Sequence, residues 1–269
     1  MINIKFYSIY EDTPNSFQTY WFNVTKDINK ADILMFTDFK VIERDNIPPT
    51  TAKKYALMIE PRMFEGIKQQ YEYLEKNWKK FDIIYTHDSI LLKKCPNAKL
   101  LYWGKVWSWS DKQKTKNIST ISSNKDWCPL HHKRLEIVRE LDRLGLCDCY
   151  GTFNNGREVT TAAAHEDYMF AFVMENYIDD YWFTEKILNC FSNKVVPIYY
   201  GARKITDFFD KNGIIILEKP EDIIPMLKDF DFKTEYLKKS QALQNNYERV
   251  KFFSDFWQML YNMYKFDFY

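Results

Sequence analysis

The apolar spacing of the segment that begins at Thr184, Glu185 and Lys186 predicts a helix. The side chains at the start of this helix suit an anion site. Thr184 is a good N-cap. A lysine in the first turn meets the positive end of the helix dipole, which costs about 0.3 to 1 kcal/mol if no negative charge lies nearby. A diphosphate on the backbone N–H groups would supply that charge, and Glu185 could then bind a ribose diol. Alternatively, both side chains face solvent.

Polar residues and a glycine close the predicted strands on either side of this helix. Glu175 and Asn176 end "MFAFVMEN", and Gly201 ends "VVPIYYG". Ligands of parallel sheets bind at the carboxyl ends of the strands. We therefore expect these residues and the helix N-terminus to meet in one crevice.

Alternating short apolar runs and longer amphipathic segments predict an α/β protein with largely parallel sheets. With 269 residues, we expect two domains. The polar, lysine-rich segment 108–117 is the best candidate for the linker between them. A long aromatic helix, about 234–264, is expected to finish the chain.

Composition and charge exclude several classes of protein. A hydrophobic share of 46% argues against disorder, and 38 Lys and Arg against 37 Asp and Glu leave no overall field for nucleic acid. The N-terminus lacks the pattern of a signal peptide, and no apolar run is long enough to span a membrane. We expect a cytoplasmic protein whose five cysteines are reduced.

Three segments within residues 168–202 match one family signature in order and spacing. "YMFAFVMEN", "DDYWFTEKILNCF" and "KVVPIYYGA" resemble the α-1,3/α-1,4-fucosyltransferase family, which has a strand ending in Glu-Asn, then Tyr-x-Thr-Glu-Lys, then Val-Pro-x-x-x-Gly. Agreement continues more weakly on both sides, upstream to the helix "HHKRLEIVRELDRLG", so that the convincing resemblance covers about 118–240. The first half matches loosely.

The resemblance implies a GT-B fold, in which two Rossmann-like domains face each other across a cleft. We expect an acceptor-side domain over 1–114, a nucleotide-sugar domain over 115–245, and a C-terminal helix over 246–269 that packs back on the first. By motif position, Lys186 and Arg134 would bind the donor diphosphate and Glu185 the ribose. The rest of the implied donor site is Glu175, Asn176, Trp182, Thr184 and Gly201. Alternatively, Glu175 and Asn176 brace loops, and Arg134 is an exposed helix charge.

Inverting transfer needs a base that takes the proton of the acceptor hydroxyl. Glu60 ends the strand "YALMIE" directly before Pro61 and resembles an acidic residue of the family; its alternative role is to cap the helix that begins near Met63. His87 is the second candidate, beside Asp88, whose more common role would be a helix N-cap.

The predicted acceptor contacts are aromatic. Trp103 and Trp107 could stack on a sugar ring, although core packing is commoner for tryptophan. The aromatic C-terminal helix leaves peripheral membrane contact as an alternative.

No metal is expected to be obligatory. A structural zinc is the minority interpretation of five thiols and imidazoles with irregular spacing, Cys128, His131, His132, Cys147 and Cys149.

The resulting hypothesis is an inverting glycosyltransferase that moves fucose from GDP-fucose to an oligosaccharide in α-1,3 linkage. Trp182 stands where the family usually has tyrosine, Met174 replaces a usual phenylalanine, and "WCPLHH" is an unusual lead-in to the arginine. A different nucleotide sugar therefore stays open, as does a non-catalytic glycan- or nucleotide-binding protein.

Overall fold

The computed structural model describes residues 1–9, 20–102, 104–153 and 159–269. Its contacts divide the chain into two compact units. The first unit comprises Met1–Trp103 and Phe256–Tyr269, and the second comprises Gly104–Asp255. Both predicted domain limits, after residues 114 and 245, fall within the second unit.

The first unit contains a six-stranded sheet in the order β2-β1-β3-β4-β5-β6, in which every pairing is parallel. The central strand β3 is buried along its whole length, as its continuous apolar sequence predicts. The edge strand β2 was not predicted, because three residues are too few to show a period. The strands are β1 (Ile2–Tyr7), β2 (Phe22–Val24), β3 (Ile33–Thr37), β4 (Lys53–Met58), β5 (Ile83–Thr86) and β6 (Ala98–Leu100).

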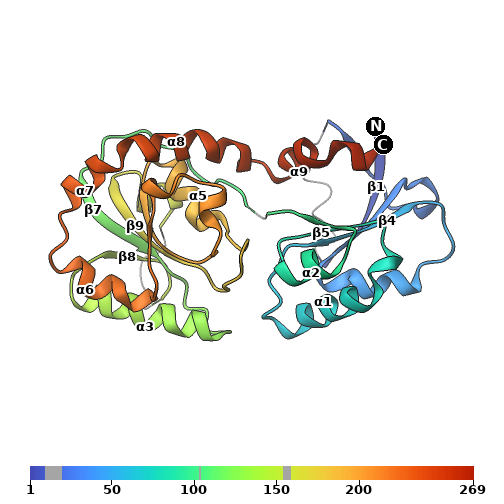
Figure 1. Cartoon of the computed structure of the whole chain (residues 1–269), viewed down its shortest axis with the longest axis horizontal. Helices are drawn as coiled ribbons and strands as arrows, with labels where there is room; N and C mark the ends of the chain where they lie inside the picture. Colours follow the sequence, from blue (N-terminus) through green and yellow to red (C-terminus); the bar gives the residue numbers. More distant parts are fainter. Residues whose placement is uncertain (10–19, 103, 154–158) are drawn as a thin grey trace. The chain divides into compact units, whose positions relative to one another are not determined.

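Helices cover both faces of this sheet (Figure 1). On one face lie α1 (Glu65–Asn77) and α2 (Ser89–Lys94), and Ile67, Tyr71 and Leu74 of α1 join the buried core over β3, β4 and β5. On the other face lies α9 (Phe256–Tyr264).

The second unit contains a five-stranded parallel sheet in the order β11-β10-β9-β7-β8. Helices α5 and α8 lie on one face and α3 and α6 on the other (Figure 1). The strands are β7 (Lys116–Ile121), β8 (Asp148–Tyr150), β9 (Tyr168–Met174), β10 (Val196–Tyr200) and β11 (Ile215–Ile216). The helices are α3 (Pro129–Arg143), α4 (Thr161–His165), α5 (Glu185–Ser192), α6 (Ile223–Leu227), α7 (Phe232–Lys238) and α8 (Ser240–Val250).

The prediction of a single long C-terminal helix is wrong. The chain is divided into α7, α8 and α9, with residues 251–255 between the last two. Phe253 lies in the second unit against Phe183 and Phe209, whereas Trp257 of α9 packs against Phe6 of the first unit. The break lets neighbouring aromatic residues join two different cores. Of the C-terminal segment expected to pack on the N-terminal domain, 246–269, only Phe256–Tyr269 joins the first unit, and residues 246–255 stay in the second.

Both sheets have the same doubly wound order. The first strand of each sheet lies between the second and the third, as in the 2-1-3-4-5 arrangement. The strand order reverses at β1/β3 in the first unit and at β7/β9 in the second, and such switch points are where ligands bind.

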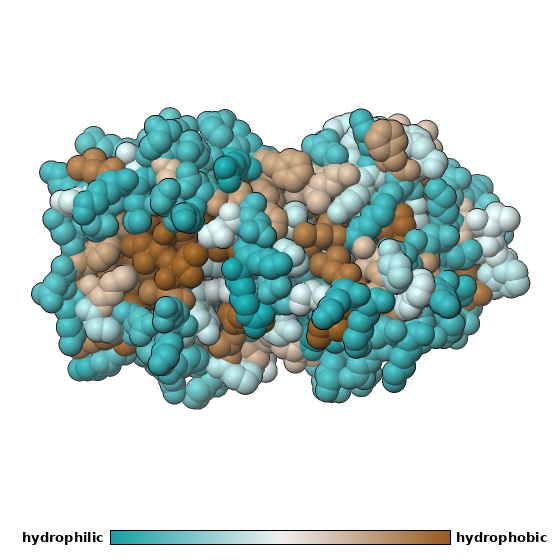
Figure 2. Space-filling model, viewed as in Figure 1, coloured by the Kyte–Doolittle hydropathy of each residue, from teal (hydrophilic) through white to brown (hydrophobic). Residues whose placement is uncertain are grey.

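The face of the molecule in Figure 2 is mainly hydrophilic, with smaller hydrophobic areas between the charged groups. In the part of the chain that the structure describes, every helix is too short or too polar to span a bilayer.

Candidate active site

A cavity of about 390 Å³ lies at the switch point of the second unit. Residues from the carboxyl ends of β7 and β9 line it together with the first turn of α5. Of the strand-end residues expected here, Asn176 lines the cavity, whereas Glu175 and Gly201 are not among its lining residues. Arg134 and His131 of α3 line the same cavity. The candidate donor residues on its wall are Arg134, Asn176, Glu185 and Lys186.

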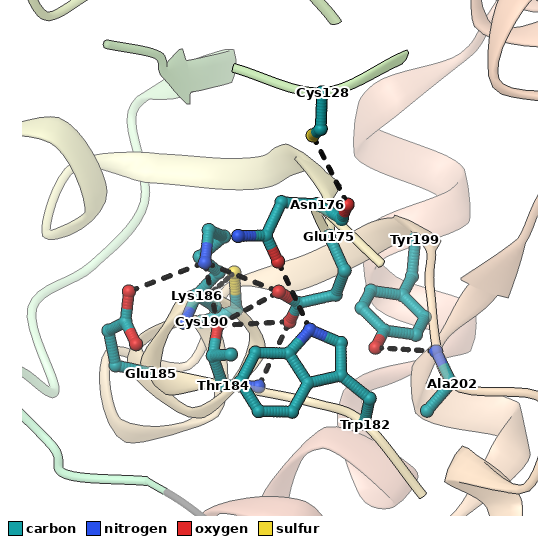
Figure 3. A network of polar contacts seen from close by, with 10 residues as sticks. All are labelled: Cys128, Glu175, Asn176, Trp182, Thr184, Glu185, Lys186, Cys190, Tyr199 and Ala202. Carbon is teal, nitrogen blue, oxygen red and sulfur yellow. Dashed lines mark hydrogen bonds and ion pairs between the residues drawn. The ribbon is translucent and has the colours of Figure 1, made fainter. Parts of the chain in front are cut away.

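Glu175 is the centre of the polar network beneath this cavity (Figure 3). Its side chain is fully buried and accepts hydrogen bonds from Thr184, at 3.0 Å from the backbone N–H and 2.9 Å from the hydroxyl. It also forms an ion pair with Lys186 at 3.2 Å. Glu175 therefore fixes the start of α5 from below, which is the bracing role left open above.

Lys186 has intramolecular counter-ions, which the sequence argument did not anticipate. Its Nζ lies 2.8 Å from Thr184 Oγ1, 3.2 Å from Glu175 and 3.4 Å from Glu185. Burial acts to lower the pKa of Lys186, but the two carboxylates outweigh it and hold the pKa above its usual value. The side chain is 31% exposed, so it is neither sealed in the core nor directed fully into solvent. Thr184 caps the helix as predicted.

Arg134 is a buried cation and not an exposed helix charge. It is 7% exposed, and its Nε has no hydrogen-bond partner among the described residues. Burial lowers the pKa of the guanidinium, whereas Glu175 acts to raise it. Burial and the positive charge of Arg134 lower the pKa of neighbouring His131 to about 4, so His131 is neutral. Two cations, Arg134 and Lys186, therefore line the cavity together with a neutral His131.

Three further candidate residues support the network. Trp182 is buried and donates its indole N–H to Asn176 Oδ1 at 3.1 Å. It therefore holds the side chain of Asn176, which lines the cavity. At Gly201, a Cβ would lie 2.2 Å from Tyr199 Oη and 2.7 Å from the Glu175 side chain. Only glycine permits this close approach beside Glu175.

Glu60 follows β4 in the first unit, at the carboxyl edge of that sheet. It does not cap the next helix, because α1 begins at Glu65 and its N-cap is Phe64. The backbone of Glu60 is bound by Asp38 and Tyr71.

The second candidate base has little surface for a substrate. His87 is 1% exposed, and its Nε2 lies 3.4 Å from Tyr71 Oη. Asp88 is the N-cap of α2, as its alternative role required, and also forms an ion pair with Arg62 at 2.6 Å.

The predicted acceptor tryptophans have different outcomes. Trp103 lies outside the described residues. Trp107 is 62% exposed, belongs to the second unit and lines the cavity, and its backbone N–H bonds to Asn189 Oδ1. Asn189 was missed by the sequence analysis, although its place four residues after Glu185 puts it on the same face of α5.

The thiols and imidazoles considered for zinc are dispersed. Cys128 contacts the Asn176 carbonyl, Cys149 contacts the Cys147 carbonyl, and His132 lies between Asp126 and Glu136. Among residues 1–9, 20–102, 104–153 and 159–269, no three His, Cys, Asp or Glu side chains are grouped to hold a metal ion.

Two doubly wound units, one with a cationic cavity at its switch point, are the architecture of GT-B glycosyltransferases. The model of glycosyltransferase family 10 (fucosyltransferase), C-terminal region, matches residues 111–266. This match covers more than half of the chain, which therefore belongs to the fucosyltransferase family and is a glycosyltransferase.

Solved structures agree with this fold. An alpha1,3-fucosyltransferase crystallised with GDP-fucose is 14% identical, with a TM-score of 0.63 over 94% of this chain and 90% of that one. An alpha1,3-fucosyltransferase crystallised with GDP gives a TM-score of 0.61 at 14% identity, over 94% of this chain and 88% of that one. TarM is 13% identical, with a TM-score of 0.59 over 87% of this chain and 54% of that one. No curated protein matches the chain in sequence.

Proposed function

We propose that this protein transfers fucose from GDP-fucose to a hydroxyl group of an oligosaccharide, with inversion at the sugar carbon and an α-1,3 linkage as product. The observation that carries the proposal is that two cations, Arg134 of α3 and Lys186 in the first turn of α5, line the same cavity. A helix N-terminus binds phosphate through its free N–H groups, and two cations beside it suit a diphosphate.

The hydrogen bonds of Lys186 suggest how the donor enters. An ammonium group has three donors, and the three contacts of Lys186 occupy them. The contact with Glu185 is the longest, at 3.4 Å, so a phosphate oxygen would replace this one first. Glu185 would then be released toward the ribose diol. Arg134 also lines the cavity, but its Nε is buried and without a hydrogen-bond partner among the described residues, so the guanidinium would have to shift for Nε to donate to a phosphate oxygen.

In the reaction, the acceptor hydroxyl oxygen forms a bond to the anomeric carbon of fucose while the bond from that carbon to the β-phosphate oxygen breaks. The electron pair stays on the phosphate, so GDP leaves with an additional negative charge. Arg134 and Lys186 stabilise that charge as it develops. The hydroxyl proton passes to a carboxylate, for which we propose Glu60.

The first test is calorimetric titration with GDP, UDP and CDP, followed by an assay of GDP release from GDP-fucose with oligosaccharide acceptors. We expect GDP to bind more tightly than UDP or CDP and turnover to require an acceptor. Equal affinity for the three nucleotides would remove the fucose assignment in favour of another donor. Tight GDP binding without transfer to any acceptor would favour a non-catalytic nucleotide-binding protein.

A further inference from the structure

Asp38 is a strained and buried residue at the switch point of the first unit. It follows β3 directly and has φ of +40°, in the left-handed region that residues other than glycine rarely adopt. Its side chain is almost completely buried. Burial raises the pKa of its carboxyl group to about 7. The strained backbone and the buried carboxyl group both lower the stability of the fold. Strained residues of this kind persist where the surrounding structure holds them in place, and they cluster at functional sites.

The carboxyl group of Asp38 binds the backbone before Glu60. Oδ1 accepts hydrogen bonds from the N–H groups of Ile59 at 2.7 Å and of Glu60 at 3.0 Å. These two N–H groups follow the end of β4 and lie beyond the residues of β4 that pair with β3 and β5. Asp38 therefore spans from the end of β3 to the segment that carries the candidate base.

Tyr71 of α1 binds Glu60 on its carbonyl side. Its hydroxyl donates to the carbonyl of Glu60 at 2.8 Å, and its ring is fully buried. The Arg62 guanidinium lies 4.6 Å from the centre of that ring and is held in turn by Asp88. The peptide groups before and after Glu60 are thus fixed from two different elements.

We propose that Asp38 and Tyr71 are positioning residues that fix the backbone of Glu60 and thereby aim its carboxylate at the acceptor hydroxyl. The inference rests on the proposed function, in which Glu60 is the base. Neither residue needs to touch a substrate. A misplacement of about 1 Å in a reacting group can lower the rate by about 100-fold, so a rigid backbone at this point has a direct catalytic effect.

The test compares three variants in steady-state kinetics with GDP-fucose and acceptor. Asp38→Gly removes the carboxylate and suits the positive φ, so it separates positioning from backbone strain. We expect kcat to fall by about 10- to 100-fold with the KM of the donor within about twofold. Asp38→Asn keeps an acceptor oxygen, and we expect it to retain kcat within about threefold. Tyr71→Phe keeps the ring and should lower kcat by about 3- to 10-fold.

Asp82→Gly is the matched control, because Asp82 Oδ2 also accepts a backbone N–H, that of Lys54, at 2.7 Å in the same unit. Its kcat should equal that of the wild type. If Asp38→Gly behaves like this control, or if Asp38→Asn loses as much as Asp38→Gly, the proposal is overturned. Should Asp38→Gly fail to fold, Tyr71→Phe decides: a lowered kcat with unchanged KM supports the proposal, and an unchanged kcat overturns it.

A double variant separates this proposal from the role of Glu60 itself. In a Glu60→Gln background, Asp38→Gly should cause no further loss, because it acts through Glu60. A full additional loss would show that Asp38 acts elsewhere, while Glu60 stays the base. Wild-type turnover by Glu60→Gln alone would remove Glu60 from the mechanism, and this inference with it.

Discussion

The two units have sheets of the same strand order, but they use their switch points differently. At β7/β9 the second unit presents charged side chains around a cavity, and Glu175, Lys186 and Arg134 set its electrostatics. At β1/β3 the first unit presents Asp38, whose carboxylate accepts hydrogen bonds from the backbone N–H groups of Ile59 and Glu60. In our account, the charged side chains of the second unit bind the donor, and hydrogen bonds to the backbone of the first unit position the base.

The largest expected effect is that of Glu60→Gln. Loss of a general base lowers kcat by about 100- to 10,000-fold, whereas GDP affinity should stay within about twofold because the donor cations lie in the second unit. Steady-state kinetics and GDP titration measure the two quantities. If the variant kept its turnover, Glu60 would not be the base, and the first unit would lose the catalytic role proposed for it.

Arg134→Ala tests the donor side of the same division. Because the guanidinium is buried at the cavity, its removal should weaken GDP binding by about 2 to 4 kcal/mol, measured calorimetrically. Lys133→Ala is the control: this neighbouring lysine of α3 is exposed and pairs with Glu136 and Glu221, so GDP affinity should not change. Equal behaviour of the two variants would contradict the donor role of Arg134.

The fold of the donor site was predictable because its signals are local. Thr184 before an apolar period indicates a helix start, and Glu175 and Gly201 end runs that are typical of buried parallel strands. The rule that ligands bind at the carboxyl ends of parallel strands then places them together. These inferences need no knowledge of contacts between distant residues.

Glu175→Gln should affect stability as well as binding. The variant removes the buried carboxylate that accepts hydrogen bonds from Thr184 and Lys186. The donors of these two residues are then poorly satisfied at a buried position. We expect the free energy of unfolding to fall by about 2 to 3 kcal/mol, measured by urea denaturation. An unchanged midpoint would show that the network under α5 contributes little to the fold.

Long-range partners could not be predicted in the same way. The ion pair of Lys186 with Glu175 depends on side-chain directions, and the sequence argument left the lysine to an external anion. The hydrogen bonds from Ile59 and Glu60 to Asp38 join residues about twenty positions apart, which no periodicity reveals. Periodicity also merged α7, α8 and α9 into one helix, because aromatic residues that enter two cores continue a single apolar pattern.

A pH dependence of stability is predicted at Asp38. Its pKa is about 7 in the folded protein, raised by burial and by Glu60 against the two backbone N–H groups, and near its ordinary value when unfolded. Between these values the folded state binds more protons, so the contribution of Asp38 to stability falls as pH rises from about 4 to about 7. Relative to Asp38→Asn, the wild type should lose on the order of 3 kcal/mol over this range. Urea denaturation at both pH values measures this. The prediction would be contradicted if the difference in unfolding free energy between the wild type and Asp38→Asn were the same at both ends of the range.

The comparison of GDP with GMP in wild type and in Lys186→Ala tests the central claim most directly. If Lys186 and the α5 N-terminus bind a diphosphate, calorimetry should show that the wild type prefers GDP to GMP, and the variant should lose most of that preference while binding GMP almost unchanged. A variant that still discriminates fully between the two nucleotides would contradict the account, because the diphosphate would then be recognised elsewhere.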